Sequence, residues 1–334
     1  MFDLKNIKSV FIIAELSANH NQNKDIAIAT IKAAKKAGAD AIKLQTFTPD
    51  TITLNCRNKY FNIDHGTIWD GKNLYDLYKE AYTPWEWHQE LFSVAKNEGL
   101  LCFSSPFDNS AVDFLENLNT PIYKIASPEI TDIPLIKYVA SKNKPIILSS
   151  GISRIEDLQL AVETIRKEGN NNIAILKCTS SYPTLPEEAN LSTISDIKKK
   201  FNVVTGLSDH TLGIMAPVIA VSFGAKIIEK HFILDKSVGG PDVEFSLDFE
   251  EFKQMVESVR IAEKMIGKID YSLSPKVERV RELGSRSLFV VKEIRAGEKI
   301  TENNVRSIRP GHGLHPKYYY EILGKKTKVL LRKG

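Results

Sequence analysis

The chain has 334 residues, of which 43% are hydrophobic and 26% are charged, with 45 Lys and Arg against 41 Asp and Glu. This composition is typical of a globular protein and excludes disordered, collagen-like and disulfide-rich chains. No apolar run approaches the roughly 20 residues of a membrane span, and the first ten residues lack a signal peptide's hydrophobic region. We therefore expect a cytoplasmic protein without membrane contact. Its three cysteines, which lack CxxC spacing, predict neither a disulfide nor a zinc site.

Charge is unevenly distributed along the chain. Residues 285–334 carry 12 Lys and Arg against four Asp and Glu, whereas the first 284 residues carry 33 against 37. Such a basic tail can bind nucleic acid, form a solvated face, or act as a lid that brings cations to an anionic substrate. The tail has no RNP, zinc-finger or helix-turn-helix signature, so we expect no nucleic-acid partner.

Short β-branched runs alternate with longer runs of helical spacing. The expected strands are residues 11–16, 41–46, 100–105, 122–127, 145–150, 173–178, 202–209 and 226–232. Helical spacing follows them, from residues 24–38 to the closing helix at 249–267. Eight strand–helix units predict an α/β protein with a closed (β/α)8 TIM barrel, since the glycine-rich phosphate turn of an open doubly wound sheet is missing.

The domain boundaries follow from a change of pattern after the closing helix. We expect the barrel over residues 1–270 and a polar linker with one helix-like patch over 271–284. Short strands and repeated Gly and Pro turns then predict a small, mostly β domain over 285–334.

All eight expected strands end on side chains that donate or accept hydrogen bonds. The carboxyl ends of barrel strands converge on one mouth, where barrel enzymes place their chemistry. Lys43, Lys124 and Lys177 lie near these ends together with several serines, and Gly151 lets backbone amides approach closely. Any one lysine could be a salt-bridged rim residue, but the group favours a phosphate or carboxylate cradle.

His210 and His231 end neighbouring expected strands at the same mouth. A lone histidine would be read as a packing residue, whereas a pair favours an open, exchangeable site for a divalent metal such as Mn, Co or Mg. Asp209 and Asp242 are either carboxylate neighbours of this pair or turn-forming caps. The tryptophans, all between residues 69 and 87, are expected to pack or to form an interface.

Several segments resemble, in order and along the whole chain, the phosphoenolpyruvate-dependent sialic acid synthase family. The matching segments of the barrel are IIAELSANHN, DAIKLQTF, SSPFD, YKIAS, ILSSG, CTSSYPT, GLSDHT, EKHF and GGPD. The tail is similar to that family's antifreeze-like (SAF) domain through RSL and RPGHGLHP. Within the family, AELSANHN, SSPFD and RPGHGLHPK are most similar to the pseudaminic acid synthase branch.

The resemblance implies a transferase that condenses phosphoenolpyruvate with an open-chain 2-acetamido aldose, releasing phosphate and giving a nine-carbon 2-keto acid. For the pseudaminate branch the implied sugar is 2,4-diacetamido-2,4,6-trideoxy-L-altrose, and the N-acetylneuraminate and legionaminate branches are the alternatives. A metal-polarised aldehyde would be attacked by C3 of phosphoenolpyruvate, after which C–O cleavage would expel phosphate.

The resemblance also assigns roles to individual residues. The carboxylate of phosphoenolpyruvate would contact Lys43, Ser105 and Ser127. Its phosphate would contact Lys124, Ser149, either Ser150 or Gly151, and Ser208. His210 and His231 would hold the metal beside Glu15, the expected general base or water-orienting group. The sugar would contact Gln45, Tyr182 and Asp242, with Asp242 as a hydroxyl anchor or second proton carrier. Ser180 departs from the pattern, since N-acetylneuraminate synthases carry Asn there against the sugar.

Arg309 matches the family's arginine that reaches into the partner protomer's barrel, which implies a homodimer with exchanged C-terminal domains. That arrangement favours the lid among the interpretations of the basic tail. Two other functions stay open from the residues alone. One is a Schiff-base pyruvate aldolase or lyase with Lys177 as nucleophile. The other is a carbohydrate-binding or ice-surface protein in which the tail is the active part.

Overall fold

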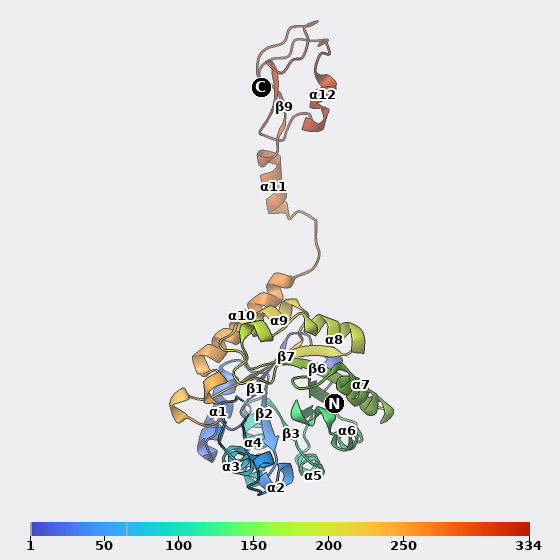
Figure 1. Cartoon of the computed structure of the whole chain (residues 1–334). Helices are drawn as coiled ribbons and strands as arrows, with labels where there is room; N and C mark the ends of the chain where they lie inside the picture. Colours follow the sequence, from blue (N-terminus) through green and yellow to red (C-terminus); the bar gives the residue numbers. More distant parts are fainter. Residues whose placement is uncertain (1, 65) are drawn as a thin grey trace. The chain divides into compact units, whose positions relative to one another are not determined.

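The computed structural model describes residues 2–64 and 66–334, so Met1, at which the predicted barrel domain begins, and His65 lie outside the described residues. The chain forms two compact units, one that ends at Gly267 and one that runs from Lys268 to Gly334. In the first unit, eight parallel strands pair in chain order and close into a barrel (Figure 1). The predicted (β/α)8 barrel is therefore confirmed.

Each barrel strand coincides with an expected run to within a few residues. The strands are β1 (Phe11–Glu15), β2 (Ala41–Thr46), β3 (Leu101–Pro106), β4 (Tyr123–Ile125), β5 (Ile146–Ser149), β6 (Ile173–Cys178), β7 (Val204–Asp209) and β8 (Ile227–His231). Strand β1 closes the barrel, because Glu15 is in register with Lys43 of β2 on one side and with His231 of β8 on the other. Three predicted site residues thus lie at one level of the barrel.

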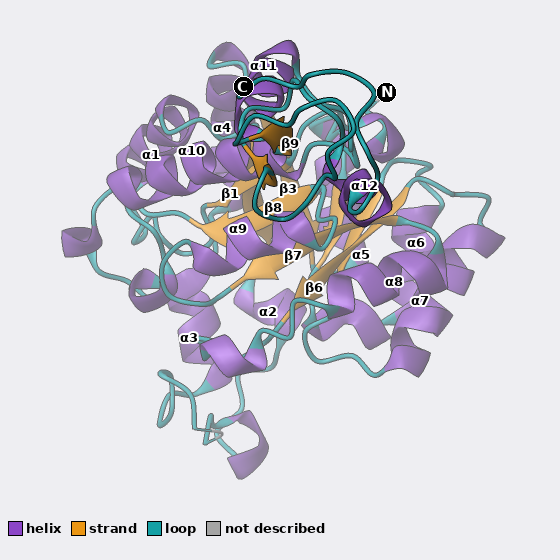
Figure 2. Ribbon diagram, turned by 90° about the horizontal axis from the view of Figure 1, so that it is seen from above, coloured by secondary structure: helices purple, strands orange, loops and turns teal. Residues whose placement is uncertain are grey.

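Helices surround the strands, as the view from above shows (Figure 2). They are α1 (Lys24–Lys36), α2 (Pro49–Ile52), α3 (Leu74–Ala81), α4 (Trp85–Asn97), α5 (Asn109–Asn117), α6 (Ile133–Ala140), α7 (Ile155–Lys167), α8 (Thr193–Phe201), α9 (Met215–Ser222) and α10 (Phe249–Ile266). Helix α10 begins with a capping box at Asp248. The Asp248 side chain accepts a hydrogen bond from Glu251 N, and the Glu251 side chain accepts one from Asp248 N. Within the described ranges, the chain contains no helix with the length and apolarity to span a membrane.

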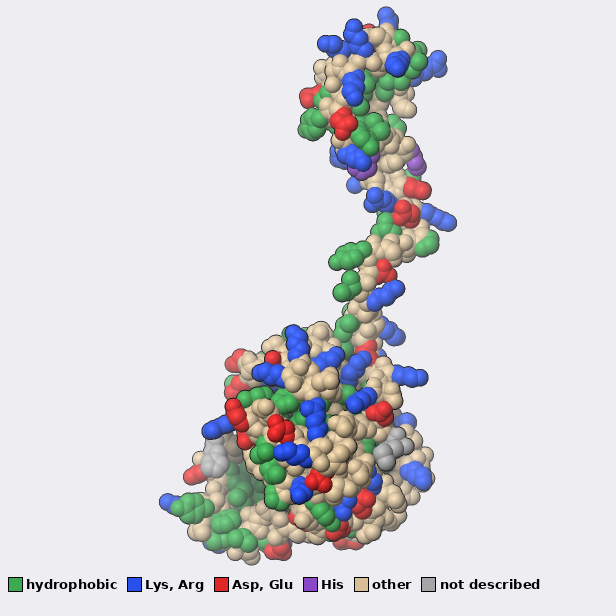
Figure 3. All heavy atoms as spheres, turned by 90° about the vertical axis from the view of Figure 1, so that its right-hand side faces the viewer, with side chains coloured by type: hydrophobic (Ala, Val, Ile, Leu, Met, Phe, Trp, Pro, Cys, Tyr) green, Lys and Arg blue, Asp and Glu red, His purple; other side chains and the backbone are tan. Residues whose placement is uncertain are grey.

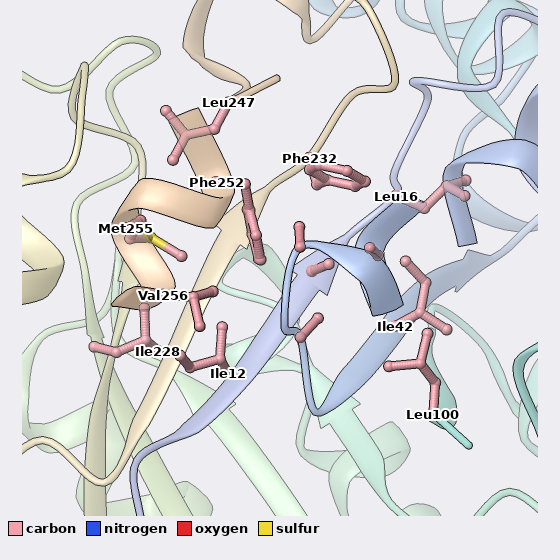
Figure 4. Close-up of a cluster of buried hydrophobic side chains, with 14 of the residues drawn as sticks. Ile12, Leu16, Ile42, Leu100, Ile228, Phe232, Leu247, Phe252, Met255 and Val256 are labelled. Atoms are coloured by element: carbon pink, nitrogen blue, oxygen red, sulfur yellow. The ribbon is translucent and has the colours of Figure 1, made fainter. Parts of the chain in front are cut away.

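Two apolar layers hold the barrel together. Outside the strands, Ile12 of β1 and Ile228 of β8 pack against Phe252, Met255 and Val256 of α10 (Figure 4). These helix residues recur at the spacing of one helical face, which is why α10 lies along the barrel. Inside the barrel, a second cluster fills the end opposite the mouth with Ile13, Ala41, Phe103, Ile147, Ala174, Leu176 and Ile227. This packing leaves the carboxyl ends of the strands as the place for a ligand.

The second unit is small and mostly irregular. It contains α11 (Pro275–Gly284), the antiparallel pair β9 (Ser287–Val290) and β10 (Val305–Ile308), and α12 (Tyr319–Ile322). Leu288, Ile294 and Val305 form its buried cluster. Lys and Arg side chains are spread over the face of this unit that Figure 3 shows, as the charge count of the tail leads one to expect.

Candidate active site

A cavity of about 370 Å³ opens at the carboxyl ends of the barrel strands. Its size falls within the range of small-molecule sites. Most of the site residues predicted from the sequence line this one cavity: Glu15, Lys43, Gln45, Lys124, Ser127, Ser149, Tyr182, Ser208, His210, His231 and Asp242. Their convergence follows from strand alternation, since every second residue of a barrel strand faces inward.

Four charged side chains alternate in sign on the inner wall of the cavity. Lys43 Nζ lies 2.9 Å from Glu15 Oε2 and 3.7 Å from Glu229 Oε1. Lys124 Nζ lies 3.3 Å from the same Glu229 oxygen, which also accepts a hydrogen bond of 2.8 Å from Ser208 Oγ. All four charged residues are at most 5% exposed. A buried charge is tolerated only when it is paired, so these four residues depend on one another.

Burial and pairing move the pKa values of these groups in different directions. Burial raises the pKa of Glu15 to about 7, in spite of its contact with Lys43. Burial would also raise the pKa of Glu229, but the attraction of Lys124 and Lys43 outweighs it and lowers that pKa to about 2. Glu229 is therefore the permanent carboxylate of the group, whereas Glu15 can take up or release a proton near neutrality, as a general base must.

A pocket of small side chains lies beside the charged group. A Cβ added at Gly151 would stand 2.0 Å from Ser180 Oγ, 2.5 Å from Ser127 Oγ and 3.1 Å from Cys178 Sγ, so glycine is required by the close approach. Ser180 Oγ donates to Ser127 Oγ at 3.2 Å, and the buried Ser149 Oγ has no hydrogen-bond partner among the described residues. An orphaned buried hydroxyl of this kind is typical of a group that bonds a ligand.

Four barrel residues to which the resemblance assigns substrate contacts do not line the cavity themselves. Ser105 accepts a hydrogen bond of 3.4 Å from Lys43 Nζ, and Ser150 Oγ accepts one of 3.2 Å from Cys178 N. Ser180 and Gly151 both lie next to Ser127. Each of the four residues thus contacts a residue that lines the cavity. Arg309 belongs to the second unit, and its predicted role stays a prediction.

The two histidines lie next to each other at the ends of β7 and β8. Their ring centroids are 5.4 Å apart. His210 Nδ1 lies 3.0 Å from Thr179 O, so this nitrogen carries the proton and Nε2 is left as an acceptor. Burial and the neighbouring His210 hold the pKa of His231 well below its usual value, and its buried Nδ1 has no hydrogen-bond partner within residues 2–64 and 66–334. Burial lowers the pKa of His210, but its contacts with Cys178 and with the Thr179 carbonyl outweigh burial and raise that pKa, so His231 is the neutral member of the pair. Once His210 has released its proton from Nε2, the two imidazoles offer ring nitrogen atoms that fit a divalent metal.

The histidines are a pair rather than part of a larger ligand cluster. In the part of the chain that the structure describes, no cluster of three or more His, Cys, Asp and Glu side chains has the arrangement of a metal site. Asp242 Oδ2 lies 3.6 Å from His231 Nδ1, and burial raises the pKa of Asp242. A metal held by two histidines would need substrate or water oxygens as its other ligands, which is the pattern of an open catalytic site.

One buried ion pair fixes the ends of the two histidine-bearing strands. Lys230 Nζ lies 2.6 Å from Asp209 Oδ2 and also donates to Thr211 O. Each charged partner is adjacent in sequence to a histidine, and both are almost completely buried. Asp209 also accepts a hydrogen bond from Thr211 N, so it caps the turn after β7 and helps to position His210. The sequence alone left open whether Asp209 is such a cap or a carboxylate neighbour of the histidines.

The structure corrects one expectation. Lys177 does not line the cavity; its Nζ donates to Cys178 O at 2.7 Å and to Thr179 Oγ1 at 2.8 Å. It therefore neither joins the anion cradle nor serves as the nucleophile of a Schiff-base aldolase. Trp69 packs, as expected of the tryptophans, with its ring 5.4 Å from that of Tyr182, and it also lines the cavity.

Among the lining residues that sequence reasoning missed, Glu129 and Phe245 lie closest to the chemistry of the site. Burial raises the pKa of Glu129 to about 7, and its Oε2 has no hydrogen-bond partner in the described part of the chain. Its place two residues after Ser127, just beyond a barrel strand, was a signal that could have found it. Phe245 packs its ring against both histidines, at 5.9 Å from His210 and 4.8 Å from His231. Its position in a short 3-10 helix after β8 (Val243–Phe245) carried no comparable signal.

The fold and this mouth define a (β/α)8-barrel enzyme whose inner wall combines buried lysines, serines and a histidine pair. Comparison with protein families gives the particular family. The model of the NeuB family matches residues 30–271, and the model of the SAF domain matches residues 285–334. The chain belongs to the NeuB family, the sialic acid synthase family that the sequence motifs resemble.

Known relatives match almost the whole chain. Pseudaminic acid synthase of Campylobacter jejuni is 51% identical over 98% of this chain and 95% of its own length. Pseudaminic acid synthase of Helicobacter pylori is 49% identical over 96% of this chain and 94% of its own length. A crystal structure of N-acetylneuraminic acid synthetase from Leptospira borgpetersenii, in complex with citrate, has a TM-score of 0.73 at 30% identity and covers 82% of this chain and 90% of its own.

Proposed function

We propose that this protein is a pseudaminic acid synthase, which condenses phosphoenolpyruvate with 2,4-diacetamido-2,4,6-trideoxy-L-altrose and releases phosphate. The observation that carries this proposal is the 51% identity, over 98% of the chain, to a relative named pseudaminic acid synthase. The cavity supports it, because buried lysines, hydroxyls and two adjacent imidazoles are the groups that an anionic substrate and a divalent ion require.

The charged wall and the serine pocket account for the binding of phosphoenolpyruvate. The proposed contacts of the carboxylate are Lys43, Ser105 and Ser127, and those of the phosphate are Lys124, Ser149, Ser150 or Gly151, and Ser208. The orphaned Ser149 hydroxyl and the close packing of Ser127 and Ser180 around Gly151, which admits no side chain there, support this assignment. Because two anionic groups are held at fixed points, C3 of phosphoenolpyruvate is oriented toward the rest of the cavity, and such orientation is a large part of catalysis.

The histidine pair is the proposed site of a divalent metal such as Mn, Co or Mg. His210 Nε2 and a ring nitrogen of His231 are the proposed ligands. A metal bound there supplies Lewis-acid polarisation of the sugar aldehyde. Phe245 offers an apolar contact to both imidazoles, since its ring lies within 6 Å of each.

The remaining groups handle protons and the sugar. Glu15, with its pKa near 7, is the proposed general base, and Gln45 Nε2 holds its Oε1 at 3.0 Å. Asp242, which accepts a hydrogen bond of 3.4 Å from Ala18 N, is the proposed hydroxyl anchor or second proton carrier. Tyr182, a proposed sugar contact, lines the same cavity and has its ring 4.4 Å from that of His210 in a tilted arrangement.

A homodimer with exchanged C-terminal domains is the proposed assembly, with Arg309 reaching the partner's cavity. Large apolar side chains that are strongly exposed support it: Met265 at 81%, Ile269 at 91%, Tyr271 at 94% and Leu283 at 67%. Green side chains stand out along this segment in Figure 3. Apolar surface of this extent fits burial by a second copy of the chain. Mixing inactive His231→Gln with inactive Arg309→Ala protein should restore part of the activity, and no restoration would exclude the exchange.

The test of the proposed function is a reconstitution with purified protein. We expect phosphate release from phosphoenolpyruvate only in the presence of the trideoxy aldose and a divalent metal, with loss on adding EDTA and recovery on adding Mn. Mass spectrometry of the product from a mixture of acetamido aldoses distinguishes the pseudaminate, legionaminate and N-acetylneuraminate branches. Absence of phosphate release with every aldose would overturn the proposal.

A further inference from the structure

The cavity has two chemically different halves. Its strand-end half carries the buried charges, hydroxyls and imidazoles described above. Its other half is built by the segment between β2 and α4, residues 47–84, and by Phe107. Among the described residues of this segment that line the cavity, all are apolar or aromatic except Asn62 and Thr67. The apolar lining residues of the segment are Phe47, Ile52, Tyr60, Ile63, Trp69, Leu74, Leu77, Tyr78 and Ala81.

The apolar half is held in place at two points. On the histidine side, Trp69 Nε1 donates a hydrogen bond of 3.2 Å to Pro241 O, and the Trp69 ring packs against Tyr182 and Phe245. On the lysine side, the ring of Phe47 lies 5.1 Å from that of Phe107 and 5.6 Å from that of Tyr78. The wall is thus anchored to loops that follow β8 and β3.

Ile63 occupies a defined place between these anchors. Its backbone N donates to Lys72 O and its O accepts from Gly71 N, both at 2.9 Å, so a short loop fixes the residue. Its side chain is 7% exposed although it lies outside every helix and strand. A loop that buries a β-branched apolar side chain beside a ligand cavity is built to offer apolar contact.

Such a wall is unsuited to an ordinary hydroxylated hexose. A sugar hydroxyl placed against Ile63 or the ring face of Trp69 would lose its hydrogen bonds to water without gaining others from these two side chains. A methyl group in the same place is favoured, because it leaves water for apolar surroundings. The proposed substrate carries three methyl groups, one at C6 and one in each acetamido group.

We infer that residues 47–84 form the element that determines sugar specificity, with Ile63 and Trp69 as the specificity-determining residues that receive the methyl groups of the substrate. This inference rests on the proposed function, since it concerns the same cavity. The aldehyde end of the sugar then faces the imidazoles and lysines, and its deoxy and acetamido groups face the apolar wall. The wall binds substrate and takes no part in proton transfer.

The experiment compares three sugars at saturating phosphoenolpyruvate: the trideoxy aldose, its analogue with a hydroxyl at C6, and its analogue with a hydroxyl in place of the 4-acetamido group. An analogue that is not turned over is measured as a competitive inhibitor. We expect the wild-type enzyme to prefer the trideoxy aldose over each analogue by about 10- to 100-fold, the usual value of one apolar group in a specificity pocket.

Trp69→Gln and Ile63→Thr replace apolar surface with smaller, polar side chains. Each variant should reduce the preference for the trideoxy aldose over at least one analogue by about 10-fold. The KM for phosphoenolpyruvate should stay within about 2-fold of the wild-type value, because the anion cradle lies in the other half of the cavity. Trp69→Phe keeps an aromatic wall and should retain most of the preference. Trp87→Phe is the matched control, since Trp87 packs against His20 and does not line the cavity.

The outcomes separate this inference from the proposed function. If the wild-type enzyme does not turn over the trideoxy aldose, the proposed function fails and the inference fails with it. If the wild type turns it over but both variants keep the wild-type preferences, only the inference is overturned. The same holds if both variants lose activity on all three sugars by an equal factor, since the segment would then serve structure alone.

Discussion

The substitution Gly151→Ala tests the serine pocket directly. The added Cβ would stand 2.0 Å from Ser180 Oγ and 2.5 Å from Ser127 Oγ, well inside any real carbon–oxygen contact, so both hydroxyls must move. Alanine would not strain the backbone at this position, because Gly151 is not among the glycines with positive φ. Overpacking of this kind costs about 1–3 kcal/mol, which lowers the melting temperature of a chain this long by roughly 2–5 °C.

The larger effect should fall on phosphoenolpyruvate. Displacement of Ser127 removes one hydrogen bond to an ionised group, worth about 1.5–3 kcal/mol, so KM should rise about 10- to 100-fold. The assay is phosphate release against phosphoenolpyruvate concentration at saturating sugar. Ser180→Ala in the same protein removes the closest atom and should recover part of the loss.

Gly284→Ala is the matched control. A Cβ at Gly284 meets no atom of the described residues within 4 Å, and its φ is not positive, so the substitution should leave KM and melting temperature unchanged. A KM for phosphoenolpyruvate within 2-fold of wild type in Gly151→Ala would refute the reasoning that places the anion at this glycine.

Two further substitutions test the charges of the cavity. Lys43→Met leaves Glu15 and Glu229 buried beside each other without their shared cation. Thermal denaturation should therefore show that the free energy of unfolding falls by about 3–5 kcal/mol, and the rate of phosphate release should fall at least about 100-fold. An unchanged melting temperature would contradict the pairing. Glu129 holds its proton up to about pH 7 in the folded protein but only to about 4.5 when unfolded, so its contribution to stability is lost as pH rises between these values. Glu129→Gln should therefore melt at a higher temperature than wild type at pH 8 and at a similar temperature at pH 4.5. If the melting temperatures of variant and wild type differ equally at both pH values, the raised pKa of Glu129 is ruled out.

The barrel could be predicted because its strands are buried on both faces. Such strands are continuous β-branched runs, and eight of them separated by helical spacing leave few alternative folds. The bounds were least certain where a strand is short. Strand β4 covers only Tyr123–Ile125, because Pro128–Thr131 already forms a 3-10 helix. The residues before Pro128 therefore turn out of the strand sooner than their apolar pattern indicates.

The polar half of the candidate site could be predicted for a related reason. Alternation in a strand places Glu229 and His231 on one face, and convergence of strand ends brings Lys43 and Lys124 to the same mouth. Lys177 was misplaced because it alternates with Leu176 and Cys178, which face the inside of the barrel, so its own side chain lies on the other face of β6. The apolar half was missed because Trp69 reaches the cavity through contacts with Tyr182 and Pro241, more than a hundred residues away, which no local pattern encodes.

The position of β1 between β2 and β8 makes the site depend on closure of the barrel. Glu15, Lys43 and Lys124 come from the first half of the barrel, but Glu229, the carboxylate that contacts both lysines, belongs to the last strand. Without β8 paired to β1, the two lysines lack this shared partner and His210 lacks the second histidine. The strand pair that closes the barrel therefore supplies the shared carboxylate and the second imidazole together, so an opened barrel has no complete site.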